Sequence, residues 1–413
     1  MKTTCLAAAA PVMAGVMAGV MAGAAFSHSA AAQVSDGVVK IGILTDISGG
    51  LSDSTGMGSV LGARMAIEDF GGKVLGKPIE LVYADHLNKA DVGAGIARKW
   101  FEAERVDAVF DLANSAVALA VQGLGQQMNR ITVVSSSASS DLTGKACSPT
   151  GIHWTYDTYS LAHVTGKAAV RQGAKRWFFI TADYAFGHAL ERDTAAVIQQ
   201  NGGTSLGSVK APLGTADFSS FLLQAQASKA EIIGLVSSNA DFINSVKQAS
   251  EFGVVAGGQK LSALLPSLTD IHSLGLPIAQ GLQVTTAFYW DQSPEARAFS
   301  RRFFERHKRM PEAYQAGDYG AVMHYLKAIE AAGTDDATAV MAKMRATPIN
   351  DFMTKNGQVR EDGRVIRDMY YYEVKAPAES KEPWDYYKLL QVIPGNEAYR
   401  PLSESECPLV KKG

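Results

Sequence analysis

The chain has 413 residues, with 39 Lys and Arg against 41 Asp and Glu, and a formal net charge of -2 at pH 7. This balance gives no electrostatic reason to expect nucleic acid or an anionic membrane surface as a partner. The length suggests two domains rather than one.

Residues 1–32 predict a secretory signal peptide. Lys2 is the one Lys or Arg among them, and an apolar run rich in Ala, Met, Val and Gly extends to Phe26. Ala30 to Ala32 supply small residues before a cleavage expected ahead of Gln33. A membrane anchor is the alternative, but the run is short and rich in Ala and Gly. Cys5 precedes the apolar run, which argues against a lipoprotein anchor.

The exported chain would retain Cys147 and Cys407. An oxidising compartment favours a disulfide between them over two free thiols. Such a bond would attach the C-terminal tail to the loop after Ser139 and Ser140.

Strand and helix signals then alternate. Short apolar runs predict parallel strands, and the helices between them predict right-handed crossovers. The first group of expected strands is Val38–Leu44, Ile79–Ala84, Ala108–Leu112 and Ile131–Val134, with helices over 60–70, 92–101 and 117–128.

The pattern restarts near Tyr156, with a helix expected from there to residue 172. Further strands are expected at Trp177–Thr181, Ser205–Lys210 and Ile232–Val236, and helices at 187–200, 218–227 and 241–252. Longer helices follow at 295–308, 316–332 and 336–345, and strands at 369–374 and 386–392. The sequence therefore predicts an α/β fold with two lobes built on parallel sheets.

Ligands bind to open parallel sheets outside the carboxyl ends of the strands. Six loops fall there: 46–55, 112–115, 135–140, 182–188, 237–241 and 264–268. They are rich in hydroxyl groups, and Ser115 stands just before a helix, where an anion is favoured. Each serine taken alone is equally compatible with turn or cap chemistry. Their joint location favours binding.

The sequence lacks a G-x-S-x-G elbow, a Walker loop and an H-E-x-x-H motif, and Gly56 to Gly62 do not have dinucleotide spacing. The histidines are scattered, so we expect neither a metal nor a cofactor. Asp46, Asp183 and Asp241 stand at strand ends. They could be the acids of a hydrolase, but without a nucleophile motif we favour helix caps or ligand contacts.

The chain resembles the solute-binding proteins of branched-chain amino-acid type ABC transporters over essentially its whole exported length. The segments that carry the resemblance are VKIGILTDISGG at 39–50, GARMAIEDFGG at 62–72, GKPIELVYAD at 76–85, TADYAFGHA at 181–189 and DFSSFLLQ at 217–224.

This resemblance implies two Rossmann-like lobes joined by three chain crossings, here near Tyr156, Thr286 and Arg364. The N-terminal lobe would then comprise 33–156 and 287–363, and the C-terminal lobe 157–286 and 364–413. It also implies a periplasmic monomer whose lobes close on a small molecule and then dock on a membrane permease.

Family positions imply a ligand carboxylate held at Ser115, Ser136 and Ala138, and a ligand side chain near Thr55 and Phe186. The full set of expected ligand contacts is Asp46, Thr55, Asn114, Ser115, Ser136, Ser137, Ala138, Tyr184, Phe186, Ser238, Asp241, Leu264 and Tyr314.

Two departures from the family bear on the ligand. Amino-acid binders commonly place an acid where this chain has Leu264-Leu265-Pro266, and often a tyrosine where Ser238 stands. A buried ammonium would lack its counter-charge, at a serious cost, unless Asp46 or Asp241 replaces it. We therefore expect a small carboxylate, aromatic acids included. The alternatives are an amino acid or amide binder and, less favoured, an exported hydrolase or a ligand sensor.

Overall fold

The computed structural model describes residues 1–10, 33–171 and 173–411. The chain divides into two units, Met1–Ala31 and Ala32–Gly413. The apolar run and the cleavage site of the predicted signal peptide fall on 11–32, outside the described residues. In the described part of the chain, no helix has the length and apolar character needed to cross a membrane.

The first sheet has six strands in the order β2 (Lys73–Val74), β3 (Lys77–Asp85), β1 (Val39–Thr45), β4 (Ala108–Asp111), β5 (Ile131–Val134) and β6 (Gly151–His153). All neighbours are parallel except the β2–β3 hairpin. Every residue of β4, β5 and β6 is buried. Burial on both faces explains why β4 and β5 are continuous apolar runs apart from Asp111 and Thr132.

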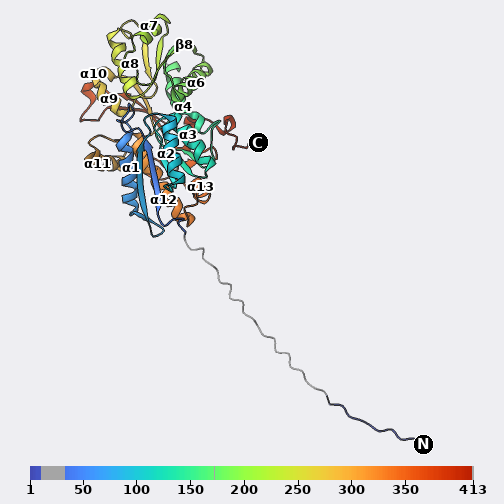
Figure 1. Ribbon diagram of the computed structural model, residues 1–413. Coiled ribbons are helices and arrows are strands. Elements are labelled where there is room, and N and C mark those ends of the chain that lie inside the picture. Colours follow the sequence, from blue (N-terminus) through green and yellow to red (C-terminus); the bar gives the residue numbers. More distant parts are fainter. Residues whose placement is uncertain (11–32, 172, 412–413) are drawn as a thin grey trace. The chain divides into compact units, whose positions relative to one another are not determined.

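Helices cover both faces of this sheet (Figure 1). On one face lie α1 (Gly56–Phe70), α12 (Ala313–Ala332) and α13 (Ala337–Ala346), and on the other α2 (Ala90–Glu102) and α3 (Ser115–Gln127). A Cβ atom at Gly62 would collide with the carbonyl oxygen of Gln315. Glycine therefore allows α1 and α12 to approach closely.

The second sheet is wholly parallel, in the order β10 (Lys260–Ala263), β9 (Ile232–Val236), β7 (Arg176–Ala182) and β8 (Thr204–Ala211). Its helices are α6 (Ala185–Gln200), α7 (Ser219–Ala227) and α8 (Asn239–Glu251). Short elements flank it: α4 (Thr158–Leu161), α5 (Lys167–Arg171), α9 (Leu268–Leu274) and α10 (Leu276–Ala279).

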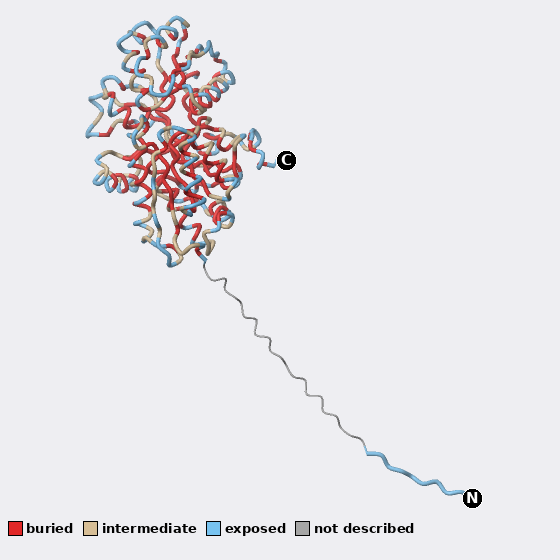
Figure 2. Tube along the Cα trace, viewed as in Figure 1, coloured by how far each residue is buried: buried red, intermediate tan, exposed pale blue. Residues whose placement is uncertain are grey.

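A third, antiparallel sheet joins β11 (Gln283–Thr286), β14 (Met369–Val374) and β15 (Tyr387–Ile393). The remaining elements are α11 (Pro294–His307), the β12–β13 pair (Gln358–Val359 and Val365–Ile366), α14 (Gly395–Ala398) and 3-10 turns at Ser140–Leu142, Pro377–Glu379 and Leu402–Glu404. Buried residues concentrate around the sheets, as Figure 2 shows.

The expected α/β class with two parallel sheets is confirmed. The helix expected over 156–172 is present as a continuous helical run from Thr158 to Arg171, in which a π-helical turn at Ala162–Gly166 joins α4 to α5. The three-residue strand β6 and the short helices α9 and α10 were not expected. They are too brief to give a periodic signal.

The chain passes between the two parallel sheets three times: after β6, after β11 and before β14. Arg364 Nη1 donates a hydrogen bond to the carbonyl oxygen of Tyr156 at 2.7 Å. Tyr156 and Thr286 line one cavity. The three expected crossing points therefore lie together, while the exact lobe boundaries stay a prediction.

Cys147 and Cys407 form a disulfide, with their Cα atoms 5.6 Å apart. Leu402 and Val410 pack around it. The bond ties the last residues, expected in the C-terminal lobe, to the loop before β6 in the N-terminal lobe.

Candidate ligand-binding site

Loops from the carboxyl ends of both parallel sheets meet around one cavity, called here the carboxyl-end cavity. Its volume of about 20 Å³ holds about one water molecule, so a larger ligand requires the walls to move apart. Its lining residues are Leu51, Ser54, Thr55, Ala113, Ser115, Ser136, Ser137, Ala138, Tyr156, Tyr184, Phe186, Ser238, Asn239, Leu265 and Tyr314. The structure thus brings together most of the residues expected from the sequence.

One wall of the cavity offers hydrogen-bond donors. Ser115 begins α3, and its Oγ accepts from the N–H of Ser139 at 3.3 Å, so its own proton is free to point elsewhere. The N–H groups of Ser137 and Ala138 donate to no group within the described residues. Together with the positive end of α3, these donors favour an anion.

The other two serine hydroxyls of this wall are already used. Ser136 donates to a carboxylate oxygen of Asp111, and Ser137 donates to the carbonyl oxygen of Leu112. Burial raises the pKa of Asp111 to about 6. The two serines thus present their backbone, rather than a free hydroxyl proton, to the cavity.

The opposite wall is formed by the N-terminal ends of α6 and α8. Tyr184 and Ser238 occupy the N-cap positions of these two helices. Asn239 follows Ser238 with φ of 53°, and its side-chain Oδ1 is buried without a hydrogen-bond partner. Because amide oxygen and nitrogen are interchangeable in such an assignment, Asn239 can offer the cavity either a donor or an acceptor.

Aromatic rings close the sides. Tyr156 donates its hydroxyl to the carbonyl oxygen of Ser136 at 2.8 Å, and its ring centroid lies 5.6 Å from that of Tyr314. The rings of Tyr184 and Phe186 lie 5.7 Å apart. Burial raises the pKa of Tyr156 and of Tyr184, so both phenols stay protonated at neutral pH.

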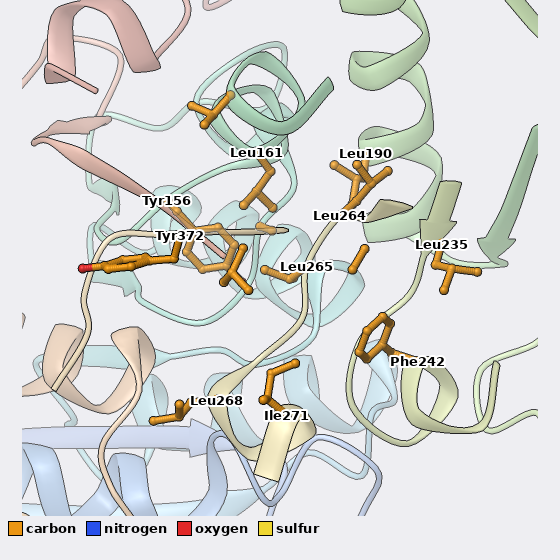
Figure 3. Packing of buried hydrophobic residues seen from close by; sticks show 14 of the residues in the cluster. Tyr156, Leu161, Leu190, Leu235, Phe242, Leu264, Leu265, Leu268, Ile271 and Tyr372 are labelled. Carbon is orange, nitrogen blue, oxygen red and sulfur yellow. The ribbon is translucent and has the colours of Figure 1, made fainter. Parts of the chain in front are cut away.

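Four of the expected residues lie outside this lining. Asn114 caps α3, accepting from the N–H of Ala116 at 2.9 Å. Leu264 lies in the hydrophobic core, and Figure 3 shows it in the same cluster as Tyr156 and Leu265. Leu265, not Leu264, lines the cavity.

The other two expected residues outside the lining are Asp46 and Asp241, the carboxylates considered as partners for a ligand ammonium. Asp46 accepts from the N–H groups of Gly49 and Leu51, both at 2.8 Å, and from Asn88 Nδ2 at 2.7 Å. Its carboxylate therefore stabilises the conformation of its own loop. Asp241 accepts from the N–H of Gly214 at 3.1 Å and lines an outer cleft, and burial raises its pKa.

Among the described residues that line the carboxyl-end cavity, none is Asp, Glu, Lys or Arg. In the same part of the chain, no group of three or more His, Cys, Asp or Glu side chains is arranged to hold a metal ion. What the lining offers is hydroxyl, amide and backbone donors between aromatic rings.

Sequence reasoning missed Leu51, Ser54, Ala113, Tyr156, Asn239 and Leu265. For Asn239 the available signal was its position after β9, inside a loop that was already selected. Its orientation depends on a left-handed backbone conformation that the sequence does not reveal.

Residues 38–381 match the family described as periplasmic binding protein. The chain belongs to this family. A periplasmic binding protein from Burkholderia mallei is 48% identical, with 91% of this chain and 99% of that chain covered and a TM-score of 0.89. The predicted resemblance is therefore confirmed, and membership implies a periplasmic location.

Two further solved structures are informative. A branched chain amino acid ABC transporter periplasmic ligand-binding protein from Burkholderia xenovorans LB400 is 40% identical, covering 90% of this chain and 100% of that chain, with a TM-score of 0.81. An R. palustris ABC transporter solute binding protein in complex with 4-hydroxybenzoate is 21% identical, covering 87% and 97%, with a TM-score of 0.78. The second likeness concerns the fold alone.

Proposed function

We propose that this periplasmic binding protein is the solute receptor of an ABC importer and that its ligand is a small aromatic carboxylate. One observation carries the proposal: the carboxyl-end cavity combines free hydrogen-bond donors and aromatic walls with a lining that has no charged side chain.

The donors suit a carboxylate. The hydroxyl of Ser115, the N–H groups of Ser137 and Ala138 and the N-terminal end of α3 lie on one wall. A carboxylate that accepts two or three such hydrogen bonds is stabilised in its ionised form. The rings of Tyr156, Tyr184, Phe186 and Tyr314 then supply the apolar surface and edge contacts that an aromatic ligand favours.

The same lining disfavours an amino acid. A buried ammonium without a paired carboxylate costs several kcal/mol. Leu265 lines the cavity in the segment where an acid would be needed, and Asp46 is held by donors of its own loop. An uncharged substituent at that end of the ligand fits the lining better.

Walls from both sheets support a closing mechanism. Ser115 and Ser136 follow strands of the first sheet, whereas Tyr184 and Ser238 follow strands of the second. A ligand that contacts both walls only in the closed state shifts the equilibrium toward closure. The proposal includes a monomer that, once closed, delivers the ligand to a membrane permease without chemical change.

The test is isothermal titration calorimetry of the mature protein with benzoate, 4-hydroxybenzoate, leucine, valine and butyrate. We expect the two aromatic acids to bind and leucine and valine to give no heat. Ser115→Ala should weaken benzoate about tenfold, as expected for a hydrogen bond to a charged group. Ser250→Ala, at an exposed position of α8, is the matched control.

A second candidate is a branched-chain amino-acid receptor, favoured by the 40% identity to the Burkholderia xenovorans protein. Tight leucine binding without a response to benzoate would support it and overturn the aromatic-acid proposal. Recovery of a chemically altered ligand after incubation would instead point to an exported hydrolase.

A further inference from the structure

Two acidic side chains, called here the acid pair, are completely buried behind the carboxyl-end cavity. Asp111 ends β4 and Asp318 lies in α12, and both residues are 0% exposed. In the described part of the chain, one carboxyl oxygen of Asp111 and both of Asp318 have no hydrogen-bond partner. Buried polar atoms without a partner are uncommon, and a buried carboxylate is costly unless it is paired or neutralised.

The two carboxyl groups act on each other. Burial raises the pKa of Asp318 well above its ordinary value, Asp111 raises it further, and the hydroxyls of Ser59 and Ser135 offset this only in part. Both of these hydroxyls are themselves buried without a partner in hydrogen-bond geometry. Ser59, in α1, also lowers the pKa of Asp111, so it lies beside both members of the acid pair.

The titratable groups that face the acid pair from other elements are acidic as well. Asp46, in the loop after β1, raises the pKa of Asp111. Tyr156, in the segment after β6, has its own pKa raised in part by Asp111. Neither neighbour stabilises a second negative charge. Two carboxyl groups in such surroundings retain a proton, because like charges at close range disfavour ionisation of both.

The acid pair is linked to the wall that would hold a ligand carboxylate, called here the donor wall and formed by Ser115, Ser137 and Ala138. Ser136 lines the same cavity and donates its hydroxyl to a carboxylate oxygen of Asp111. The carbonyl oxygen of Asp111 accepts from the N–H of Ser135 at 3.1 Å and from that of Ser136 at 3.3 Å. A charge on Asp111 therefore lies directly behind the donor wall.

We propose that the acid pair takes up a proton when an anion binds at the donor wall, so that Asp111 and Asp318 determine how ligand affinity depends on pH. At neutral pH the ligand-free pair holds one proton, on Asp318. A second proton comes from the solvent and neutralises Asp111 as the ligand carboxylate binds. This inference rests on the proposed function and adds a regulation to it. Neither residue lines the cavity, so both act through Ser136 and its loop.

The direction of the pH effect follows from the charges. Burial raises the pKa of the ligand-free Asp111 to about 6, and an anion close by raises it further. Binding is therefore favoured as pH falls from 8 to 6, a range in which benzoate itself stays ionised. We expect benzoate to bind about tenfold more tightly at pH 6 than at pH 8.

Calorimetry on the mature protein tests the coupling. Benzoate is titrated at pH 6, 7 and 8, and at pH 7 in two buffers whose ionisation enthalpies differ, which gives the number of protons taken up. We expect roughly half a proton or more for each benzoate bound at pH 7. The double variant Asp111→Asn, Asp318→Asn keeps an acceptor for Ser136 but cannot titrate. It should take up no proton and bind benzoate equally at pH 6 and pH 8.

A second buried acid provides the matched control. Asp107 precedes β4 at the opposite end of the strand, accepts from the N–H of Lys40 at 2.8 Å, and has its pKa raised by burial to about 7. Asp107→Asn should keep both the proton uptake and the pH dependence of the wild type. If the double variant does not fold, Asp111→Asn alone should still lose the uptake.

Infrared spectroscopy reports on the acid pair without any ligand. The difference spectrum between wild type and Asp318→Asn at pH 7 should show the band of one protonated carboxyl group, and the absence of this band would refute the proton on the pair. Benzoate binding without proton uptake, or with unchanged uptake in the Asn variants of the pair, refutes the coupling and leaves the aromatic-acid function standing. If no carboxylate binds, the proposed function fails and the coupling fails with it.

Discussion

The disulfide between Cys147 and Cys407 closes a loop with a sequence separation of 260. In the chain-entropy description, a cross-link stabilises a protein by restricting the unfolded chain, and a loop of this length corresponds to about 5–6 kcal/mol. Measured contributions are commonly about 2–4 kcal/mol because unfolded chains keep residual structure. We therefore expect the double variant Cys147→Ser, Cys407→Ser to lose about 2–4 kcal/mol of unfolding free energy.

The loss should be global rather than confined to the tail. Tyr399 donates to the carbonyl oxygen of Thr155 at 3.2 Å. The guanidinium of Arg400 lies 3.5 Å from a carboxylate oxygen of Asp193, and its Cζ atom lies 4.6 Å from the ring centroid of Tyr159. These contacts hold the chain up to Arg400 without the bond. Only the residues after it should loosen in the folded variant.

Urea unfolding, followed by tryptophan fluorescence, measures the effect. The mature chain would contain no other cysteine, because the third, Cys5, lies in the predicted signal peptide. Reduced wild-type protein should therefore match the double-serine variant. Equal unfolding free energies for oxidised and reduced wild-type protein would refute the reasoning. Benzoate affinity serves as the control and should not change, since neither cysteine lines a cavity described above.

Three further predictions concern single residues. Leu265→Glu places an anion in the carboxyl-end cavity and should weaken benzoate binding about 100-fold. Calorimetry measures the effect, with Leu264→Met as the control. Unchanged affinity for benzoate would contradict the assigned lining. Glu312→Gln tests a pH effect. The folded pKa of about 8 lies above the ordinary value of 4.5, so the stability linked to the protonated form is complete below about pH 4.5 and is lost as pH rises through 8. Between pH 5 and pH 9 the wild type should lose about 4 kcal/mol relative to the variant, and parallel pH profiles in urea would exclude a buried neutral acid. Asp46→Ala leaves the buried N–H of Leu51 and the part-buried N–H of Gly49 unpaired and should lower the unfolding free energy by about 1–3 kcal/mol. A variant as stable as wild type would show that the three hydrogen bonds of Asp46 contribute little.

The sequence was sufficient to predict which loops meet, because parallel strands deliver their carboxyl ends to one edge of each sheet. Ser115, Ser136 and Tyr184 come together for that reason. The direction of individual side chains was not predictable. Asp46 turns back to the N–H groups of its own loop, a contact that depends on how residues 49–51 fold.

The cavity lined by Tyr156, Glu312 and Tyr387 was also beyond sequence reasoning. Its walls come from distant segments, and no local periodicity links them. The choice between Leu264 and Leu265 illustrates the same limit. Both are apolar, adjacent and part of the core, and only the packing of the strand end decides which one also faces the cavity.

The third sheet bears on how fast the protein can respond. It pairs β11, which immediately precedes one crossing, with β14, which follows another, so that Val284 faces Tyr372 in register. The bond from Arg364 to Tyr156 ties the remaining crossing to these two. We expect three segments coupled in this way to bend together rather than independently. Ligand binding would then restrict few additional conformations of the chain, which lowers the entropic cost of association.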